Sequence, residues 1–245
     1  MKPAEHARSR LDDLLSADAL LRVVEPGIWS VLPADAPGQP YDRKAAFYDA
    51  LIGGAWYNRL LWGTDHREYA KFARRALRSA PTGWHLDAGC GSLVGTHEVY
   101  SEVRDRPCLL VDLSLGMLRR GRGRLGPGSP TTLLQADLRS LPLRPHSMHS
   151  ALCMGMLHLF DDDSAAAVLD GMVQGLVPRA PVYITSLVLG RRIGDRYLRV
   201  LERAGEVAAP RTAESVSTLV QDSGLVVVDR NVSGNMLFLV AETGG

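Results

Sequence analysis

The sequence WHLDAGCGS, residues 84–92, decides the fold, because a short apolar run leads here into a turn with two glycines. Gly89 and Gly91 allow the backbone to bend tightly, and they allow a ligand to approach the main chain because neither carries a Cβ. A helix that starts after such a turn directs its free N–H groups at the same space. An enzyme that binds a dinucleotide would carry the spacing GxGxxG at this place. Here the spacing is DxGxG, and the carboxylate of Asp87 disfavours a pyrophosphate but favours a ligand with an ammonium group.

Downstream of this turn, short apolar runs alternate with longer amphipathic stretches. Such an alternation predicts βαβ units and therefore a mostly parallel sheet with helices on both faces. The last two apolar runs are separated by Ser233, Gly234 and Asn235 alone, and this short connection predicts an antiparallel hairpin at the C-terminus. Strands are expected at WHLDA, PCLLVDL, TTLLQAD, HSALCMG, PVYITSL, LVVVDRNV and MLFLVAE, and helices at about 93–104, 115–125, 162–176, 193–206 and 212–223. The predicted fold class is α/β with a seven-stranded sheet.

Upstream of the turn, the first 40 residues do not follow this alternation and form a predicted N-terminal appendage. Residues 4–15 have the pattern of a short amphipathic helix, and two β-prone runs flank Pro26-Gly27, which predicts a hairpin. Residues 33–40 are rich in Pro, Ala and Gly, as a linker is. The chain is therefore predicted to divide into an appendage with its linker (1–40), a helical segment rich in aromatic residues (41–80) and a core domain (81–245).

The composition is that of a globular protein without a marked charge. The 245 residues include 28 Lys and Arg and 27 Asp and Glu, so the net charge is +1. Proteins that bind nucleic acid usually have a clear basic surplus. The N-terminus has no apolar signal core, and no apolar run reaches the ~20 residues that span a membrane. We therefore expect a cytoplasmic protein whose partner is neither nucleic acid nor a membrane.

The cysteines and histidines carry no metal or disulfide signature. Cys90, Cys108 and Cys153 are odd in number and form no CxxC pair. Each falls in or beside an apparent buried strand, where a free thiol packs as a small hydrophobic group. The histidines show no spacing typical of ligands, so no metal site is predicted.

Four features in register make the chain resemble the class I, Rossmann-like methyltransferases that use S-adenosylmethionine. LDAGCG resembles the first motif of that family. Asp112, in LLVDLS, ends the second predicted strand 25 residues after Asp87, where the family has the acid that accepts both ribose hydroxyls. Ala136-Asp137-Leu138 resembles the family's motif beside the adenine. Residues 150–160, SALCMGMLHLF, resemble the fourth strand and exit loop of the branch that contains the ubiquinone- and menaquinone-biosynthesis (type 11) methyltransferases.

The resemblance implies S-adenosylmethionine as the cofactor and S-adenosylhomocysteine as its product. Asp87 would then face the methionine end of the cofactor, Asp112 its ribose, and Leu113 the face of its adenine. Many family members have a third glycine where this chain has Leu93, a common substitution in the class. The predicted cofactor-binding residues are Asp87, Gly89, Cys90, Gly91, Asp112, Leu113, Ala136, Asp137, Leu138, Met154 and Tyr48.

The aromatic segment before the core extends the resemblance. YDRKAAFYDAL, residues 41–51, is similar to the segment that folds over the cofactor as a lid in this branch, and Tyr41 or Tyr48 is expected to touch the cofactor. Two interpretations of Tyr48, Trp56, Tyr57 and Trp62 stay open. These rings either enclose an apolar or planar substrate, or they pack the lid helices onto the sheet.

Methyl transfer from a sulfonium needs little chemistry from the protein, because the methyl group is already activated. Positioning of the acceptor is the main contribution, and a general base is needed only where the acceptor must lose a proton. His158 is the candidate base, because it follows the fourth strand at the edge where the family binds substrates and has an ordinary pKa near 6.5. The alternative is a histidine that packs in its loop or bonds to the backbone. The acidic run Asp161–Asp163 predicts the cap of the next helix.

The sequence favours methyl transfer to a small molecule, such as a secondary metabolite, on the strength of the compact core and the near-neutral charge. An RNA or protein methyltransferase is one alternative, but the Asn/Asp/Ser-Pro-Pro-Tyr/Phe motif of several such enzymes is missing, because the fourth strand ends in Met154-Gly155-Met156. A homologue that binds the cofactor without transferring methyl groups is the other. The acceptor, the methylated atom and the oligomeric state stay open.

Overall fold

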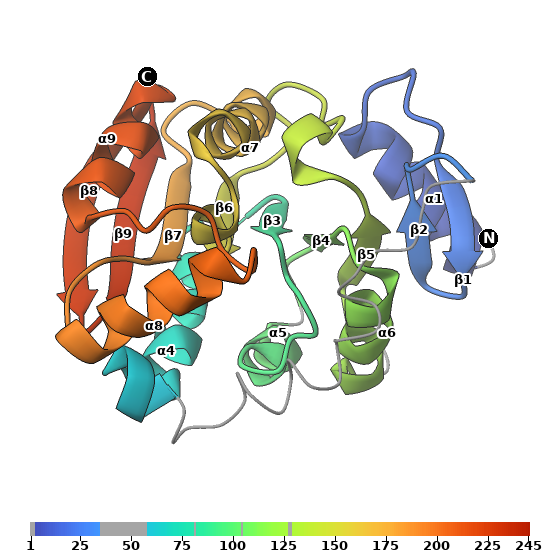
Figure 1. Cartoon of the computed structure of the whole chain (residues 1–245). Coiled ribbons are helices and arrows are strands. Elements are labelled where there is room, and N and C mark those ends of the chain that lie inside the picture. Colours follow the sequence, from blue (N-terminus) through green and yellow to red (C-terminus); the bar gives the residue numbers. More distant parts are fainter. Residues whose placement is uncertain (1–2, 35–57, 81, 104, 127–128) are drawn as a thin grey trace.

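A single sheet lies between two layers of helices in the computed structural model, which describes residues 3–34, 58–80, 82–103, 105–126 and 129–245 (Figure 1). The predicted α/β class is confirmed. Residues 41–57, which carry much of the predicted lid with Tyr48, Trp56 and Tyr57, lie outside the described residues.

Within the described part of the chain, the sheet has nine strands in the order β1-β2-β5-β4-β3-β6-β7-β9-β8. The strands are β1 (Arg22–Glu25), β2 (Ile28–Ser30), β3 (His85–Ala88), β4 (Cys108–Asp112), β5 (Thr131–Gln135), β6 (Ser150–Met154), β7 (Pro181–Leu187), β8 (Leu225–Ser233) and β9 (Met236–Thr243). The five central strands are parallel, and β9 runs antiparallel between β7 and β8. The seven predicted strands and the C-terminal hairpin are confirmed, and the N-terminal hairpin adds two more.

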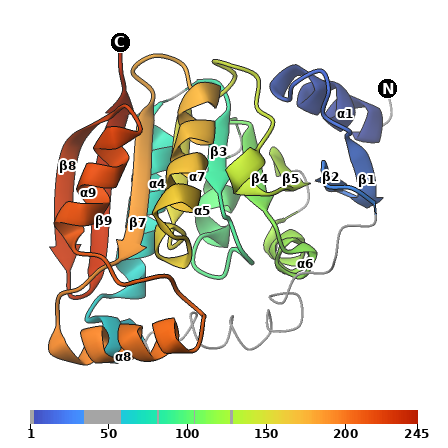
Figure 2. The ribbon, with the colours of Figure 1, turned by 45° about the horizontal axis from the view of Figure 1, so that its top comes forward.

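The helices cover both faces of the sheet, except α8, which lies beyond the carboxyl end of β7 (Figure 2). They are α1 (Pro3–Leu14), α4 (His66–Ser79), α5 (His97–Glu102), α6 (Leu115–Arg124), α7 (Asp162–Gly175), α8 (Arg192–Arg203) and α9 (Ala213–Asp222), with single turns at η1 (Asn58–Trp62), η2 (Leu138–Ser140) and η3 (Leu157–Leu159). Side-chain oxygens cap several of them. Asp161 accepts the N–H of Ser164 at 2.8 Å at the start of α7, so the predicted cap is confirmed.

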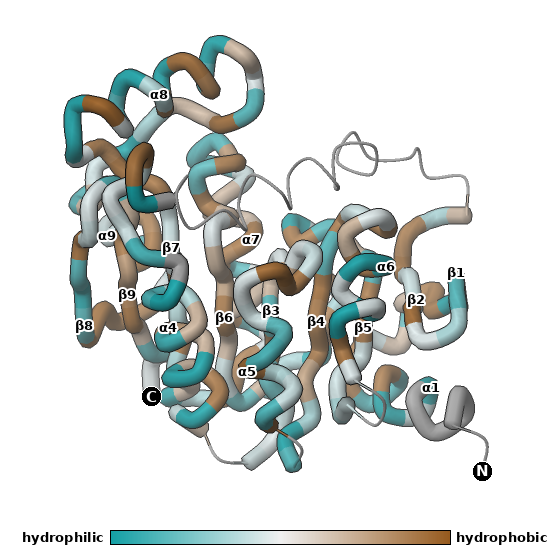
Figure 3. Tube along the Cα trace, turned by 90° about the horizontal axis from the view of Figure 1, so that it is seen from below, coloured by the Kyte–Doolittle hydropathy of each residue, from teal (hydrophilic) through white to brown (hydrophobic). Residues whose placement is uncertain are grey.

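Each central strand buries both of its faces. In β4, Leu109 and Val111 pack with α1, α7 and α9, whereas Cys108 and Leu110 pack with α4, α5 and α6. Successive side chains of a strand point to opposite faces, so a strand covered on both sides reads as a continuous apolar run. The buried strands β4, β6 and β9 accordingly show brown, hydrophobic stretches in Figure 3.

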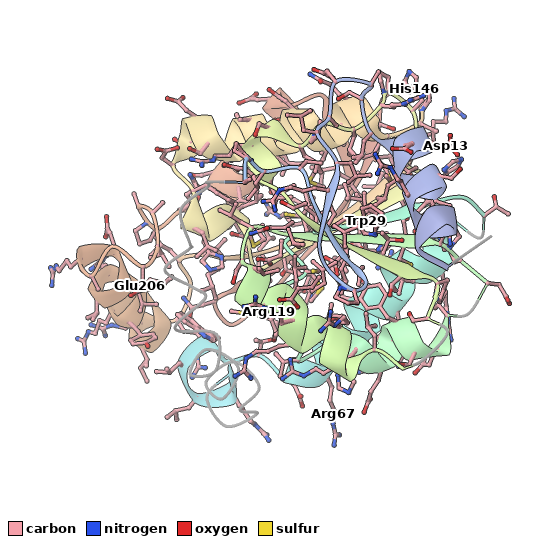
Figure 4. All side chains as sticks on the ribbon, turned by 90° about the vertical axis from the view of Figure 1, so that its right-hand side faces the viewer. Asp13, Trp29, Arg67, Arg119, His146 and Glu206 are labelled. Atoms are coloured by element: carbon pink, nitrogen blue, oxygen red, sulfur yellow. The ribbon has the colours of Figure 1, made fainter. Side chains whose placement is uncertain are left out.

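The N-terminal appendage is part of the main sheet. Gly27 adopts a left-handed φ of 81° at the hairpin turn, and β2 then pairs in parallel with β5 through Ile28 and Leu133. Figure 4 looks onto this edge, with Trp29, 4% exposed, in the interior and Asp13 on the outer side of α1. The hairpin therefore covers the edge that β5 would otherwise leave open. Leu11 and Leu14 of α1, and Leu15 directly after it, are buried in the core that also contains Trp29.

Candidate active site

A cavity of about 400 Å³ opens at the carboxyl ends of the central parallel strands. The chain runs from β3 outward through β4 to β5 and then returns to β6 on the other side of β3. The loops after β3 and β6 therefore diverge, and in open α/β sheets such a switch point is where ligands bind. The volume lies in the range of small-molecule sites. The cavity is lined by the loops after β3, β4, β5 and β6.

The glycine turn after β3 forms one wall of the cavity. The N–H groups of Gly89 and Cys90 both donate to the carbonyl oxygen of Val111 at 2.9 Å, which ties the turn to β4. Gly89 and Gly91 have left-handed φ angles of 84° and 57°. A Cβ on Gly91 would meet no atom within 4 Å, so its backbone faces open space, whereas the flexible side chain of Met156 covers Gly89.

Leu93, where many family members have a third glycine, adopts a left-handed backbone conformation of the kind that glycine favours. Leu93 has a φ of 60°, which an L-residue adopts at a cost of about 1–2 kcal/mol. Its buried side chain packs against α6, where a Cβ on Gly121 would lie 3.3 Å from Leu93 Cγ. The packing of Leu93 offsets the backbone strain.

Asp87 sits at the end of β3 with 3% of its surface exposed. The hydroxyl of Tyr100, on α5, donates to Asp87 Oδ2 at 2.5 Å. Burial raises the pKa of Asp87 to about 7, with a further increase from the charge of Asp112, whereas the bond from Tyr100 lowers it. The carboxyl group is therefore poised to change its charge near neutral pH.

Asp112 ends β4 on the opposite side of the glycine turn. Its Oδ2 accepts the N–H of Gly91 at 2.8 Å, and its Oδ1 accepts the N–H of Ser114 at 2.8 Å. These two bonds fix the carboxylate at the cavity wall. A carboxylate oxygen can accept more than one hydrogen bond.

The residues after β5 divide between the cavity and the core. Asp137 and Leu138 line the cavity, as do Leu113 and Cys90 from the preceding loops. Asp137 caps η2 and pairs with Arg139 at 2.6 Å, and this partner lowers its pKa.

Ala136 lies differently from the other predicted residues. It is fully buried in the core cluster and is not among the residues that line the cavity. Its N–H donates to the carbonyl oxygen of Asp112 at 3.2 Å, so its observed contact is with β4.

The far side of the cavity is apolar. Trp62 and Tyr69, from the described part of the segment 41–80, line it together with Leu187 at the end of β7 and Met236 at the start of β9. The ring of Trp62 also packs on Tyr197 of α8, with ring centroids 5.4 Å apart. Met154, predicted from the fourth strand, lines the cavity as well.

His158 lies in η3, on the loop after β6, and lines the apolar side of the cavity. Its Nδ1 accepts the backbone N–H of Leu187 at 3.4 Å. Arg211 fixes the loop by donating to the carbonyl oxygens of Leu157 and Phe160 at 2.9 and 2.8 Å. Burial, followed by the charge of Arg211, lowers the pKa of His158 to about 4.

Several residues of the site were not predicted. Tyr100 does not line the cavity itself but donates its hydroxyl hydrogen bond to Asp87, and a lone tyrosine on the buried face of α5 was the available signal. Leu187 and Met236 come from distant strands and carry no motif. Tyr48 lies outside the described residues. Within the described part of the chain, no group of three His, Cys, Asp or Glu side chains is arranged to hold a metal ion.

Comparison with known proteins agrees with this geometry. Residues 86–179 match a family model described as a methyltransferase domain. The chain matches no curated protein sequence significantly. No helix among the described residues combines the length and apolar character needed to cross a membrane.

Three solved structures illustrate the shared fold. The putative methyltransferase bound to the Trm112 activator of Haloferax volcanii has a TM-score of 0.64 and 14% identity, over 86% of this chain and 100% of that one. The cyclase SpnF has a TM-score of 0.65 and 17% identity, over 84% and 94%. Human N-acetylserotonin methyltransferase in complex with S-adenosylmethionine has a TM-score of 0.63 and 15% identity, over 87% and 61%.

The type 11 branch stays a prediction, since these findings reach the class and not the branch. The matched domain contains the glycine turn, Asp112 and the loop of His158, and the fold is similar to that of an enzyme solved with S-adenosylmethionine. Residues 86–179 therefore belong to a methyltransferase domain, and the chain has the class I, Rossmann-like fold of enzymes that bind S-adenosylmethionine.

Proposed function

We propose that this enzyme transfers the methyl group of S-adenosylmethionine to a small organic molecule bound on the apolar side of the cavity. One observation carries the proposal. Asp87 and Asp112, at the ends of neighbouring strands, flank a glycine turn whose backbone faces open space at Gly91. The size of the cavity and the near-neutral charge of the chain support a small acceptor.

The polar groups beside the glycine turn fit the cofactor. Asp87 and Asp112 present two carboxylates, and among the described lining residues the guanidinium of Arg139 is paired with Asp137. An acidic wall favours a ligand that carries a positive charge and disfavours a phosphate. In this proposal Asp87 faces the ammonium group of the cofactor, and Asp112 accepts hydrogen bonds from its ribose.

The neighbouring apolar residues fit the adenine. Leu113, Met117 and Leu138 line the cavity between the loops after β4 and β5. Transfer of a flat aromatic ring from water into such an apolar part of the cavity is favourable, because it removes apolar surface from water. Asp137 stands at the rim, where its carboxylate can accept a hydrogen bond from the amino group of the ring.

Bound S-adenosylmethionine supplies a methyl group that the positive charge on sulfur has already activated. The residues of the chain then have three tasks: they bind both partners, align the acceptor with the methyl group and exclude water. Trp62, Tyr69, Leu187 and Met236 would surround the acceptor. Alignment of this kind lowers the activation barrier of the methyl transfer by several kcal/mol.

The variant Asp112→Ala tests the proposal, with S-adenosylhomocysteine binding measured by calorimetry. Each hydrogen bond to a charged group contributes about 1.5–3 kcal/mol, so the loss of the ribose contacts should weaken binding at least about tenfold. Asp222→Ala, at an exposed position at the end of α9, is the matched control and should bind as the unchanged protein does. Absence of binding by the unchanged protein at millimolar ligand would refute the proposal.

Turnover distinguishes the alternatives. An RNA or protein acceptor predicts label transfer from methyl-labelled cofactor to cellular RNA or protein but not to small molecules. A non-methylating enzyme predicts tight binding with no S-adenosylhomocysteine formed with any acceptor. The likeness to SpnF, a cyclase, makes this second outcome worth measuring.

A further inference from the structure

Among the described residues, the acceptor side of the cavity combines the imidazole of His158 with the rings of Trp62 and Tyr69 and with apolar side chains. His158 lies at the wall formed by η3 and β7, near Leu187. Its loop is held from outside the cavity by Arg211, and its own carbonyl oxygen accepts the N–H of Ala208 at 3.0 Å. The imidazole is therefore anchored by its main chain and by one ring nitrogen.

That anchored nitrogen fixes the tautomer. The backbone N–H of Leu187 donates to Nδ1, so Nδ1 carries a lone pair and no proton. A neutral imidazole has a single N–H, which must then be on Nε2. Moving the proton to Nδ1 would set two N–H groups against each other, and so would protonation of the whole ring. His158 could act as a base only as the Nδ1–H tautomer or by forming an imidazolium ion. The N–H of Leu187 disfavours both states.

The surrounding charges agree with a neutral ring. Arg211 lies on the loop side of His158 and pairs with the exposed Asp162 at 2.6 Å. The carboxyl group of Asp87 and the phenol of Tyr69 line the same cavity. Burial and the charge of Arg211 keep the pKa of His158 at about 4. The ring stays uncharged at the pH values where the enzyme would work.

We propose that His158 orients the acceptor by donating a hydrogen bond from Nε2–H, and that the acceptor is a hydrophobic, weakly acidic hydroxyl compound, such as a phenol or enol, that binds as its oxyanion. This inference rests on the proposed function. It replaces the general-base role that the sequence predicted for His158.

The hydrogen bond selects oxygen over nitrogen. An oxyanion has three lone pairs, so it can accept from Nε2–H and still present a lone pair to the methyl group. An amine has a single lone pair, which the same hydrogen bond would occupy, and an ammonium ion has none. When the oxygen–methyl bond forms, the electron pair of the sulfur–methyl bond stays on sulfur, the oxyanion becomes a neutral ether, and no proton has to leave.

Nuclear magnetic resonance tests the tautomer directly. Protein labelled with ¹⁵N-histidine and saturated with S-adenosylhomocysteine is compared with its His158→Gln variant, which identifies the His158 signals by their absence. We expect the proton on Nε2 with no titration between pH 6 and 9. A proton on Nδ1, or a titration near pH 6.5, would overturn the inference. If S-adenosylhomocysteine fails to bind at all, the proposed function fails and this inference falls with it.

A second titration tests the acceptor class in the same sample. A nitrophenol, added at a pH where it is ionised, should shift the Nε2–H resonance of His158, whereas the matched nitroaniline should leave it unchanged. A shift with the amine and none with the oxyanion would contradict the proposed class.

Two variants separate a donor from a base in turnover. His158→Gln keeps an N–H donor but cannot act as a base, so it should retain most of the kcat/KM for an aryl hydroxyl acceptor. His158→Ala should lose about 10- to 100-fold, the worth of one hydrogen bond to a charged group. Equal losses in both variants, together with a pH profile that follows an enzyme group instead of the ionisation of the acceptor, would show that the donor role is wrong.

Discussion

Replacement of the buried Asp87 by Asn is expected to change the pH dependence of both folding and cofactor binding. Asn has nearly the same shape and can still accept the hydrogen bond from Tyr100, but it cannot ionise. The carboxyl of Asp87 has its pKa raised to about 7 in the folded protein, mainly by burial. In the unfolded chain it returns to its ordinary value near 3.8.

This difference in pKa determines the sign and the size of the pH dependence of the free energy of unfolding. Between pH 4 and pH 7 the folded state holds a proton that the unfolded state has released, so the free energy of unfolding falls as the pH rises. The stabilisation is complete below pH 4 and is lost once the pH has passed 7. Each pH unit in this window changes the free energy of unfolding by about 1.4 kcal/mol, so the wild type should lose on the order of 3 kcal/mol between pH 5 and pH 7 through this group.

Urea denaturation at pH 5, 6, 7 and 8 measures the effect. Asp87→Asn should be close to the wild type in stability at pH 5 and clearly more stable at pH 8. The difference between the two proteins isolates Asp87, because the other titrating groups are common to both. Asp222→Asn, at an exposed position, controls for the loss of one carboxylate.

Cofactor binding should show the opposite trend. The ammonium group of S-adenosylhomocysteine is attracted by the ionised form of Asp87, so its affinity should fall by up to about tenfold per pH unit below pH 7. In Asp87→Asn the affinity should be lower and nearly independent of pH. Tyr100→Phe removes the bond that lowers the pKa of Asp87, so the midpoint should move to higher pH. Parallel pH profiles for the wild type and Asp87→Asn, in both assays, would refute the reasoning.

Two further predictions concern the core. Leu11→Ala, on the fully buried face of α1, should destabilise the protein by about 2–5 kcal/mol in urea denaturation, and an effect below 1 kcal/mol would show that the appendage contributes little to the fold. The thiols of Cys108 and Cys153, whose pKa values burial raises to about 12, should not react with an aromatic disulfide reagent at pH 8 until urea unfolds the chain, and rapid reaction in the native state would contradict their burial.

The central fold could be predicted from the sequence because both signals that define it are local. Apolar runs of strand length alternate with amphipathic stretches, and the connection at Gly234 is too short for anything but a hairpin. The pairing of β2 with β5 could not be predicted from the sequence, because a strand of three residues has no periodicity that indicates its partner. The pairing depends on tertiary packing, because Trp29 and Leu134 lie in the core that contains the leucines of α1, whereas Ile28 and Leu133 lie in the core on the other face of the sheet.

The wall of the cavity around the glycine turn could be predicted from the sequence, whereas its apolar side could not. Asp87, Gly91 and Asp112 stand at strand ends, and strand ends of a parallel sheet meet at one edge. Ala136 was placed by the same rule, yet it faces the core, because neighbouring residues of an extended segment point in opposite directions. The protonation of His158 depends on a contact with Leu187, 29 residues away, that no spacing in the sequence reveals.

The pairing of β2 with β5 also sets an order of events during synthesis. Ile28 leaves the ribosome 105 residues before its partner Leu133, a delay of roughly 5 to 20 s at ordinary translation rates. Throughout that interval β2 has no strand to pair with on the side that β5 later occupies, so this edge of the hairpin is open to other chains. Slowing translation between these two points should lower the yield of folded enzyme more than slowing it after Leu133.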